Sequence, residues 1–168
     1  MMGVAAVKGY QGDDLTACGA IAACLKHFVG YAHSDGGRDY HYTEISPQTL
    51  WDTALLPFEM GVKAGAATVM SAFNDISGVP ASANRYTMTD ILRGMWGFEG
   101  IFMSDWNATY SAEGAANRGL DLEMPSARLM NARNLRPLIE SGVVSERTID
   151  LKCQHILQTL IAFGFLDR

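Results

Sequence analysis

Four short apolar runs recur along the chain, and each gives way to polar, glycine-containing or proline-containing sequence. They cover residues 21–25, 67–73, 101–104 and, more weakly, 120–124. Short apolar runs that stop abruptly are typical of strands in a parallel sheet covered on both faces. The pattern therefore predicts four buried parallel strands.

Amphipathic stretches separate these runs and predict helices. Ser46 and Pro47 open the first, as N-cap and first helical residue, and Pro57 should kink or divide that helix. Further helices are expected over residues 87–96, 110–118, 129–140 and 145–163. Candidate N-caps are Thr87 or Thr89 and Ser145, and glycines at positions 97 and 119 should end two of the helices.

The alternation of strands and helices predicts an α/β fold with right-handed crossovers. Four strand–helix units make half of a (β/α)₈ barrel, whose usual length is about 250 residues. The chain has 168 residues and no internal repeat or clear linker, so residues 1–168 are expected to form one unit. A half-barrel leaves two outer strands unpaired and one sheet face uncovered. We therefore expect association with the missing half or with a second copy.

Composition narrows the class of protein. Hydrophobic residues make up 48% of the chain and charged residues 18%, as in a globular protein. A net charge of −5 argues against a nucleic-acid or anionic-membrane partner. No apolar run approaches the roughly 20 residues of a membrane span, no signal-peptide pattern is present, and localisation is not indicated. Cys18, Cys24 and Cys153 lack metal-type spacing and are expected to be buried free thiols.

Polar side chains follow the predicted strands. They are Lys26 and His27, Asn74, Asp105 with Trp106, and Glu123. The carboxyl ends of parallel strands face the ligand crevice, so an acid there is more often chemical than structural. Asp105 is the first candidate. The structural alternatives are a helix cap or ion pair for Asp105, a hydrogen-bonded core position for His27, and a core position for Trp106.

Several segments, taken together and in order, resemble the family 3 glycoside hydrolases. The resemblance rests on the Lys-His-Phe segment at 22–30, Gly-Gly-Arg-Asp-Tyr at 36–40, Leu-Leu-Pro-Phe at 55–58, residues 69–74 with Gly-Val-Pro-Ala at 78–81, Leu-Arg at 92–93, Trp-Gly-Phe-Glu-Gly at 96–100, Ser-Asp-Trp at 104–106, and Gly-Leu-Asp-Leu-Glu-Met-Pro at 119–125. Each motif alone is weak, but this many in one order is specific. Within the family the chain looks closest to the β-glucosidase branch.

The resemblance implies that residues 1–168 are the second half, about four β/α units, of a TIM-type (β/α)₈ catalytic barrel. It implies release of terminal β-D-glucosyl residues with retention, through a covalent glycosyl-aspartate, without a metal or organic cofactor. The family's upstream half-barrel and its C-terminal α/β sandwich domain, which carries the acid/base Glu, are expected outside this sequence. The implied partners are a β-glucoside or oligosaccharide and the remainder of the enzyme or a second copy.

Individual roles follow from the matching motifs. Asp105 matches the catalytic nucleophile, while Lys26 and His27 match the pair that hydrogen-bonds hydroxyls of the −1 sugar. Trp106 matches an aromatic that stacks on sugar at the entrance, and Arg38 and Tyr40 are expected to line the pocket. A nucleophilic carboxylate must stay ionised, and a neighbouring ammonium such as that of Lys26 favours the charged form.

Some departures from the family pattern leave the activity open. Phe73 stands where many members carry Tyr, which removes a hydroxyl that could bond the nucleophile. Asp39-Tyr40-His41 has the spacing of the Asp–His dyad of the family's β-N-acetylglucosaminidases but lacks their Pro-Gly-His-Gly context. A β-xylosidase of the same family, a catalytically silent sugar-binding fragment, and an aldolase-type barrel with Lys26 as Schiff-base lysine also stay open.

Overall fold

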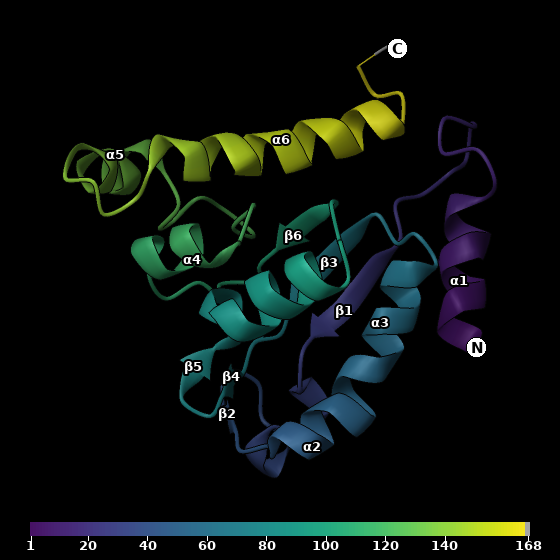
Figure 1. Ribbon diagram of the computed structural model, residues 1–168, viewed down its shortest axis with the longest axis horizontal. Helices are drawn as coiled ribbons and strands as arrows, with labels where there is room; N and C mark the ends of the chain where they lie inside the picture. The colour runs from purple at the N-terminus through teal and green to yellow at the C-terminus, as the bar shows by residue number, and fades with distance from the viewer. Residues whose placement is uncertain (167–168) are drawn as a thin grey trace.

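The centre of the molecule is a parallel three-stranded sheet in the order β1-β3-β6 (Figure 1). In the computed structural model, which describes residues 1–166, the strands are β1 (Cys24–Phe28), β3 (Thr68–Ser71) and β6 (Ile101–Met103). The fourth predicted strand is present only as a parallel bridge between Met103 and Leu122. The predicted parallel arrangement is confirmed, but residues 120–124 do not form a full ladder, because the Asp121 carboxylate takes the Phe102 N–H of β6 that a ladder would use and Pro125 follows.

A second, smaller sheet lies beyond the carboxyl ends of β1 and β3 (Figure 1). It consists of β2 (Tyr42–Thr43), β4 (Asp75–Ile76) and β5 (Val79–Pro80), with β2 parallel to β4 and β4 antiparallel to β5. The β4–β5 turn uses Ser77 and Gly78, both with positive φ, as a two-residue hairpin turn requires. Strands of two residues carry no hydrophobic period, so the sequence did not indicate this sheet.

Every predicted helix is present, although some begin later. The helices are α2 (Pro47–Thr49), the π-helix η3 (Leu50–Leu55), α3 (Leu56–Lys63), the π-helix η5 (Tyr86–Met95), α4 (Ala112–Arg118), α5 (Ala132–Glu140) and α6 (Glu146–Ala162). One helix was not predicted, α1 (Met2–Gln11), which has no side-chain N-cap. Short 3₁₀ turns occupy Tyr31–His33, Asp35–Gly37 and Ala81–Ala83. The helical hydrogen-bond pattern changes from η3 to α3 next to Pro57, which confirms the predicted division.

The helix caps are partly as predicted. Ser46 and Ser145 accept hydrogen bonds from backbone N–H groups three residues later, as expected. Thr87 and Thr89 are not caps, because the helix begins before them. Instead, the side-chain oxygen of Asn84 accepts from the N–H of Thr87 at 3.2 Å.

The core lies between the sheet and the helices η3, α3 and η5. Phe28, Val69 and Phe102, one from each central strand, are fully buried there. On the opposite sheet face Met70 pairs with Met103, and both are only half-buried. The sheet therefore has one covered face and one open face.

β6 approaches β3 so closely that a side chain at Gly100 is not tolerated. A Cβ atom there would lie 2.0 Å from the carbonyl oxygen of Ala67. Only glycine permits this contact between the two strands.

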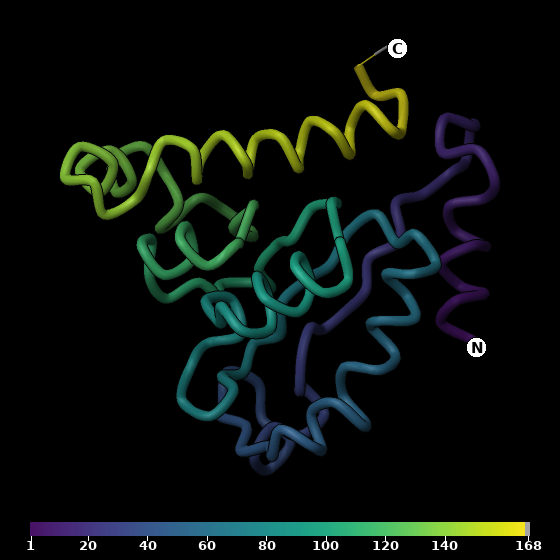
Figure 2. Tube along the Cα trace, viewed as in Figure 1, coloured from purple at the N-terminus to yellow at the C-terminus, as the bar shows by residue number. Residues whose placement is uncertain are grey.

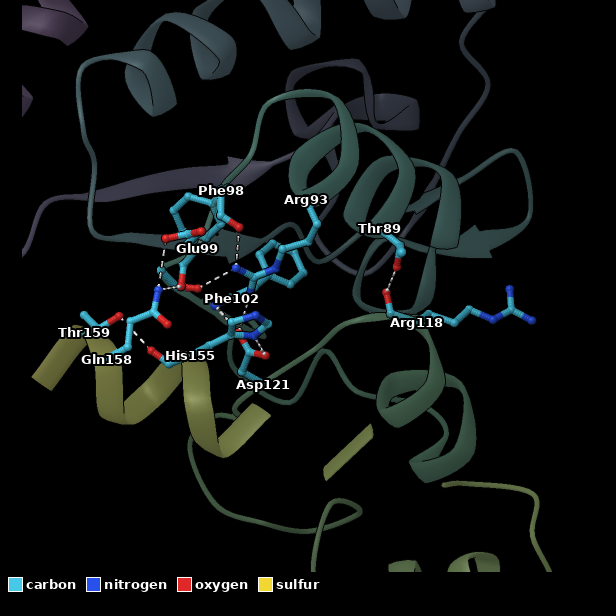
Figure 3. A network of polar contacts seen from close by, with 11 residues as sticks. Thr89, Arg93, Phe98, Glu99, Phe102, Arg118, Asp121, His155, Gln158 and Thr159 are labelled. Atoms are coloured by element: carbon cyan, nitrogen blue, oxygen red, sulfur yellow. Dashed lines mark hydrogen bonds and ion pairs between the residues drawn. The ribbon is translucent and has the colours of Figure 1, made fainter. Parts of the chain in front are cut away.

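The amino ends of the strands are joined to α6 by a buried ionic network (Figure 3). The Asp121 carboxylate accepts hydrogen bonds from the Arg93 guanidinium at 2.5 Å and the Phe102 N–H at 2.7 Å, and its other oxygen lies 2.9 Å from His155 Nδ1. Arg93 also donates to the carbonyls of Phe98 and Gly100, both at 2.7 Å. This network ties η5, β6, the fourth strand position and α6 together.

Lys152 lies one helical turn before His155 and is buried beside this network. Burial lowers the pKa of Lys152 to about 8, and the nearby Asp121 carboxylate only partly opposes that shift. Lys152 therefore adds a poorly solvated cation beside the Arg93 guanidinium, whose charge Asp121 already neutralises.

The loop that follows α1 and the end of α6 lie next to each other, beyond the amino ends of the strands. Figure 2 shows the end of α6 turning toward the loop that follows α1, and a Cβ atom at Gly164 would lie 3.5 Å from Thr16. No helix within residues 1–166 is long and apolar enough to cross a membrane.

The three cysteines, Cys18, Cys24 and Cys153, are free but exposed, so the prediction of buried thiols is wrong. Cys24 begins the outer strand β1 and Cys153 lies on an outward-facing position of α6.

Candidate active site

The backbone at Asp105 is held from both sides. Ser104, directly after β6, donates its N–H to the Leu122 carbonyl at 2.9 Å, and its hydroxyl accepts from the Met124 N–H at 2.9 Å. The Asp105 N–H donates to the Ser71 hydroxyl, at the end of β3, at 3.3 Å. The sequence does not single out Ser71, because a serine at a strand end carries no distinctive signal.

The Asp105 carboxylate is buried, with its residue 6% exposed, and its two oxygens differ. Oδ1 accepts a hydrogen bond from the Trp106 N–H at 2.7 Å. Oδ2 lies 3.2 Å from His27 Nε2, yet it forms no aligned hydrogen bond with any residue of 1–166. Buried polar atoms without a hydrogen bond are uncommon in folded proteins. Within residues 1–166, His41 Nδ1, Asn74 Oδ1 and Thr109 Oγ1 share this property, but Asp105 Oδ2 is the one that belongs to a carboxylate.

A tight turn follows and directs Trp106 outward. The Ala108 N–H donates to the Asp105 carbonyl at 3.1 Å, and Asn107 adopts a positive φ of 56°, which asparagine tolerates in turns. Trp106 is 53% exposed as a result. Its ring is therefore available to a ligand and is not a core residue.

Lys26 and His27 are consecutive residues of β1, yet both line one cavity of about 290 Å³. In a regular strand consecutive side chains point to opposite faces. Here the pairing with β3 passes from Leu25 opposite Val69 to Phe28 opposite Ser71, which is a bulge in β1. The strand therefore continues through both polar residues, whereas the sequence placed them after its end.

His27 is enclosed by aromatic rings. It stacks on Phe73 at 6.1 Å between ring centroids and lies tilted against Tyr31 at 5.0 Å. Burial lowers the pKa of His27, and the Asp105 carboxylate only partly opposes that shift. The imidazole beside Asp105 is therefore uncharged at neutral pH.

Tyr40 joins the same group from the loop after β1. Its hydroxyl donates to the backbone carbonyl of Trp106 at 2.6 Å, and its ring lies 4.5 Å from that of Phe73. Burial, together with the Asp105 and Asp39 carboxylates, raises the pKa of Tyr40. Its hydroxyl therefore remains a donor at neutral pH.

Arg38 does not join this group through any polar contact within residues 1–166. It is exposed, and its backbone carbonyl accepts from the Ser34 hydroxyl at 2.5 Å. Its assignment to the pocket stays a prediction.

Asp39, the next residue, accepts a hydrogen bond from the Tyr31 hydroxyl, which raises the pKa of Tyr31 to about 12.

The acid and imidazole of Asp39-Tyr40-His41 are not paired among the described residues. Asp39 is bonded to Tyr31, while His41 packs against Tyr42 at 4.7 Å and its Nδ1 atom has no partner within residues 1–166. This geometry does not favour the Asp–His dyad of a β-N-acetylglucosaminidase.

Two more polar residues at strand ends have structural contacts. The Asn74 amide donates to the Thr43 hydroxyl at 2.8 Å and so joins the two sheets. Glu123 accepts from the N–H groups of Leu129 and Met130 at 2.8 and 2.7 Å. The positions of Asn74 and Glu123 along the chain do not distinguish them from Asp105. Only their contacts do, and those contacts come from segments that are distant in sequence or irregular.

The site thus brings Asp105, His27, Trp106 and Tyr40 together at the carboxyl ends of parallel strands, with Lys26 beside His27. The fold is part of a (β/α)₈ barrel, and these polar groups lie on the face where barrel enzymes carry their active sites. The chain belongs to glycosyl hydrolase family 3: the family's N-terminal domain matches residues 1–159.

Similar proteins include "Beta-glucosidase B" of Emericella nidulans, 35% identical over 156 residues that cover 92% of this chain and 18% of that protein. A Rhizobium radiobacter "Beta-glucosidase" is 34% identical over 166 residues, covering 98% of this chain and 19% of the relative. The crystal structure of a β-glucosidase from Listeria innocua in complex with gluconolactone matches 99% of this chain and 25% of its own, with 32% identity and a TM-score of 0.89. The chain therefore spans about a fifth to a quarter of these relatives.

Proposed function

We propose that this chain supplies the nucleophile and part of the −1 sugar site of a retaining glycosidase that acts on terminal β-D-glucosyl residues. The observation that carries the proposal is the Asp105 carboxylate, which is buried and fixed through Oδ1 but has no aligned hydrogen bond on Oδ2. A nucleophilic carboxylate needs an oxygen lone pair that no other group occupies. Family membership and the β-glucosidase relatives support the substrate class.

In this mechanism Oδ2 of Asp105 attacks the anomeric carbon as the bond to the leaving group breaks. A carboxylic acid about 5–5.5 Å away protonates the leaving group, and its conjugate base then activates the water that hydrolyses the glycosyl-aspartate. We assign this acid/base to the C-terminal α/β sandwich domain that the resemblance implies.

His27 and Lys26 would bond the hydroxyls of the bound sugar. The cavity that both residues line adjoins Asp105 through the 3.2 Å contact between His27 Nε2 and Oδ2. Hydrogen bonds to several hydroxyls would fix the anomeric carbon near the attacking oxygen, which lowers the entropic part of the barrier. The exposed ring of Trp106 would offer an apolar face to sugar C–H groups at the entrance.

The rest of the enzyme would complete the barrel. The sheet face that carries Met70 and Met103 is half-buried, and the chain spans only a fifth to a quarter of its relatives. Strands of the upstream half-barrel would cover that face and pair with the outer edge of β1. Association of two copies of the chain is the alternative way to cover it.

The nucleophile is tested by trapping. The complete enzyme is incubated with a 2-deoxy-2-fluoro-β-glucoside that carries a good leaving group, and its peptides are then examined by mass spectrometry. We expect the fluoroglucosyl adduct on the peptide that contains Asp105 and none in the Asp105→Asn variant. Asp52→Asn, at an exposed carboxylate on η3, is the control and should keep the adduct. A label on another residue, or turnover retained in Asp105→Asn, would refute the proposal.

A further inference from the structure

A cavity of about 300 Å³ lies between η5, α4 and α6, beside the Asp121 network and on the opposite side of the sheet from the ends that carry Asp105. Its volume is at the lower end of the range of about 300–1,000 Å³ that is typical of small-molecule sites. We call it the lysine cavity. The polar side chains of its wall include those of Thr89, Arg93, Asn117, Asp121, Lys152 and His155.

Lys152 is the unusual member of this wall. It is only 6% exposed, and no hydrogen bond or ion pair within residues 1–166 engages its ammonium group. Lysine is almost never buried without a partner, because an unpaired ammonium out of water is costly. All three of its N–H donors therefore remain available to a ligand in the cavity.

The one carboxylate of the wall is already committed to other groups. Asp121 lies between Arg93 and His155 in Figure 3, and its two oxygens engage the guanidinium, the imidazole and the Phe102 N–H. Lys152 and Arg93 contribute two positive charges to the wall, and Asp121 contributes one negative charge. The lysine cavity therefore carries an excess of positive charge, which attracts an anion.

The unused polar atoms of the wall are mainly donors. Arg93 gives three hydrogen bonds, to two backbone carbonyls and to Asp121, which leaves two of its five N–H groups without a hydrogen bond among residues 1–166. Asn117 donates one of its two amide hydrogens to the Val143 carbonyl at 2.9 Å, and the second is unused. Together with the ammonium of Lys152, these donors suit a ligand that has several negatively charged oxygens.

We propose that the lysine cavity binds a small tetrahedral oxyanion, either a free sulfate or phosphate ion or the phosphate group of a small metabolite. The Lys152 ammonium would pair with the anion, and the unused N–H groups of Arg93 and Asn117 would add hydrogen bonds. The bound anion would offset the cost of the buried ammonium and so stabilise the folded enzyme. The proposal does not depend on the function of Asp105, because none of these residues belongs to that site.

The test is a calorimetric titration of the complete enzyme with sodium sulfate, with sodium chloride holding the ionic strength constant. We expect saturable binding in the wild type, and binding roughly tenfold weaker or more in Lys152→Met, because a charged hydrogen-bond donor is lost. Lys8→Met, at an exposed lysine of α1, is the matched control and should bind sulfate as the wild type does.

A second variant places a competing carboxylate in the cavity. Thr148 lines the cavity one helical turn before Lys152, so Thr148→Glu allows an i,i+4 ion pair with the lysine. The same substitution is compatible with the start of α6, because Ser145 is the N-cap and glutamate is favoured three residues later. We therefore expect Thr148→Glu to fold and to bind sulfate roughly tenfold more weakly or less.

Titration with glycerol 3-phosphate distinguishes the two sources of the anion. Binding tighter than that of sulfate would identify a phosphate monoester as the ligand, and equal or weaker binding would identify the free ion.

Three results would overturn the site. The wild type might show no saturable binding of sulfate, or Lys152→Met and Thr148→Glu might bind sulfate as tightly as the wild type does. A melting temperature of Lys152→Met in chloride below that of the wild type would show that a carboxylate from the rest of the enzyme already pairs with the lysine. Sulfate binding is measured without turnover, so a failure of the proposed function leaves this test intact.

Discussion

Two buried aspartates lie at opposite ends of the same sheet and have opposite surroundings. Asp121, near the amino ends of the strands, engages both carboxylate oxygens with a guanidinium, an imidazole and a backbone N–H. Asp105, at the carboxyl ends, uses one oxygen for a backbone N–H and leaves the other unsatisfied beside an imidazole. Burial alone therefore does not distinguish the two carboxylates, whereas the number of hydrogen-bond donors that each one engages does.

The charge balance differs in the same way. Asp121 has a permanent cation, Arg93, at 2.5 Å. Asp105 faces His27, whose pKa is lowered by burial, so no cation within residues 1–166 forms an ion pair with it at neutral pH. Asp121 is therefore committed to contacts between elements, whereas Asp105 keeps one carboxylate oxygen without an aligned hydrogen bond among residues 1–166.

The largest expected effect comes from removing the carboxylate that we propose as the nucleophile. Asp105→Asn in the complete enzyme should lower kcat by roughly 10³-fold or more, because an amide cannot attack the anomeric carbon. The free energy of unfolding should not fall, since an unsatisfied buried charge is removed. Steady-state kinetics with an aryl β-glucoside and urea unfolding check both results. A large loss of stability would mean that Asp105 is structural like Asp121.

Asp121→Asn should show the reverse behaviour. Removing its charge leaves the buried Arg93 guanidinium unpaired, at a cost of about 3–5 kcal/mol in the free energy of unfolding. Urea unfolding at pH 7 measures this cost. The double variant Asp121→Asn/Arg93→Met should lose less than the sum of the single variants, because neither partner is left alone. Strict additivity would contradict the ion pair's role.

Lys152 allows a pH-dependent test of the same network. Its pKa in the folded chain is about 8 and its ordinary value is 10.5. Below pH 8 both states carry the proton, and the folded state bears the full cost of a buried ammonium. Between about pH 8 and 10.5 the unfolded state binds more protons, so the free energy of unfolding rises with pH. The total change is about 3 kcal/mol.

Lys152→Met should therefore be more stable than the wild type at pH 7, and the difference should shrink as pH rises through this window. Comparing the two proteins at each pH cancels the titration of other groups. The charged and titratable neighbours of Lys152 are Asp121, Arg93 and His155, and all three are retained in the variant. A difference that stays constant up to pH 11 would show that the lysine is not desolvated.

The smallest effect is expected at the cap of α6. Ser145→Ala removes the hydroxyl that accepts from the Thr148 N–H and should cost about 1 kcal/mol, with no specific change in kcat. Ser126→Ala, at an exposed serine outside the helices, is the control and should change the free energy of unfolding by less than about 0.5 kcal/mol. Equal effects of the two substitutions would show that the cap does not stabilise α6.

The sequence predicted the parallel strand order, most helices and the identity of the family, because apolar runs and motif order are local or sequential signals. It did not predict that β1 continues through Lys26 and His27, since two polar residues normally end a buried strand. The cysteine burial was wrong because an apolar neighbourhood in sequence does not tell which side of an outer strand a residue occupies.

The site was predictable only in part for a similar reason. Asp105 and His27 stand in recognisable motifs, but the Ser71 hydroxyl and the Tyr31 ring come from segments that meet them only in the folded chain. Nothing in the spacing separates Glu123 from Asp105. Only the two N–H groups from which Glu123 accepts reveal its structural role.

The irregular pairing in β1 also bears on protein engineering. Transplanting Lys-His onto an ideal strand of another barrel would turn one of the two side chains away from the cavity that both line here, because a regular ladder alternates them. A designer who wants both groups to face one cavity must copy the extra residue of the bulge as well. Deleting one residue between Leu25 and Phe28 would remove that shared orientation while leaving the other motifs of the chain in place.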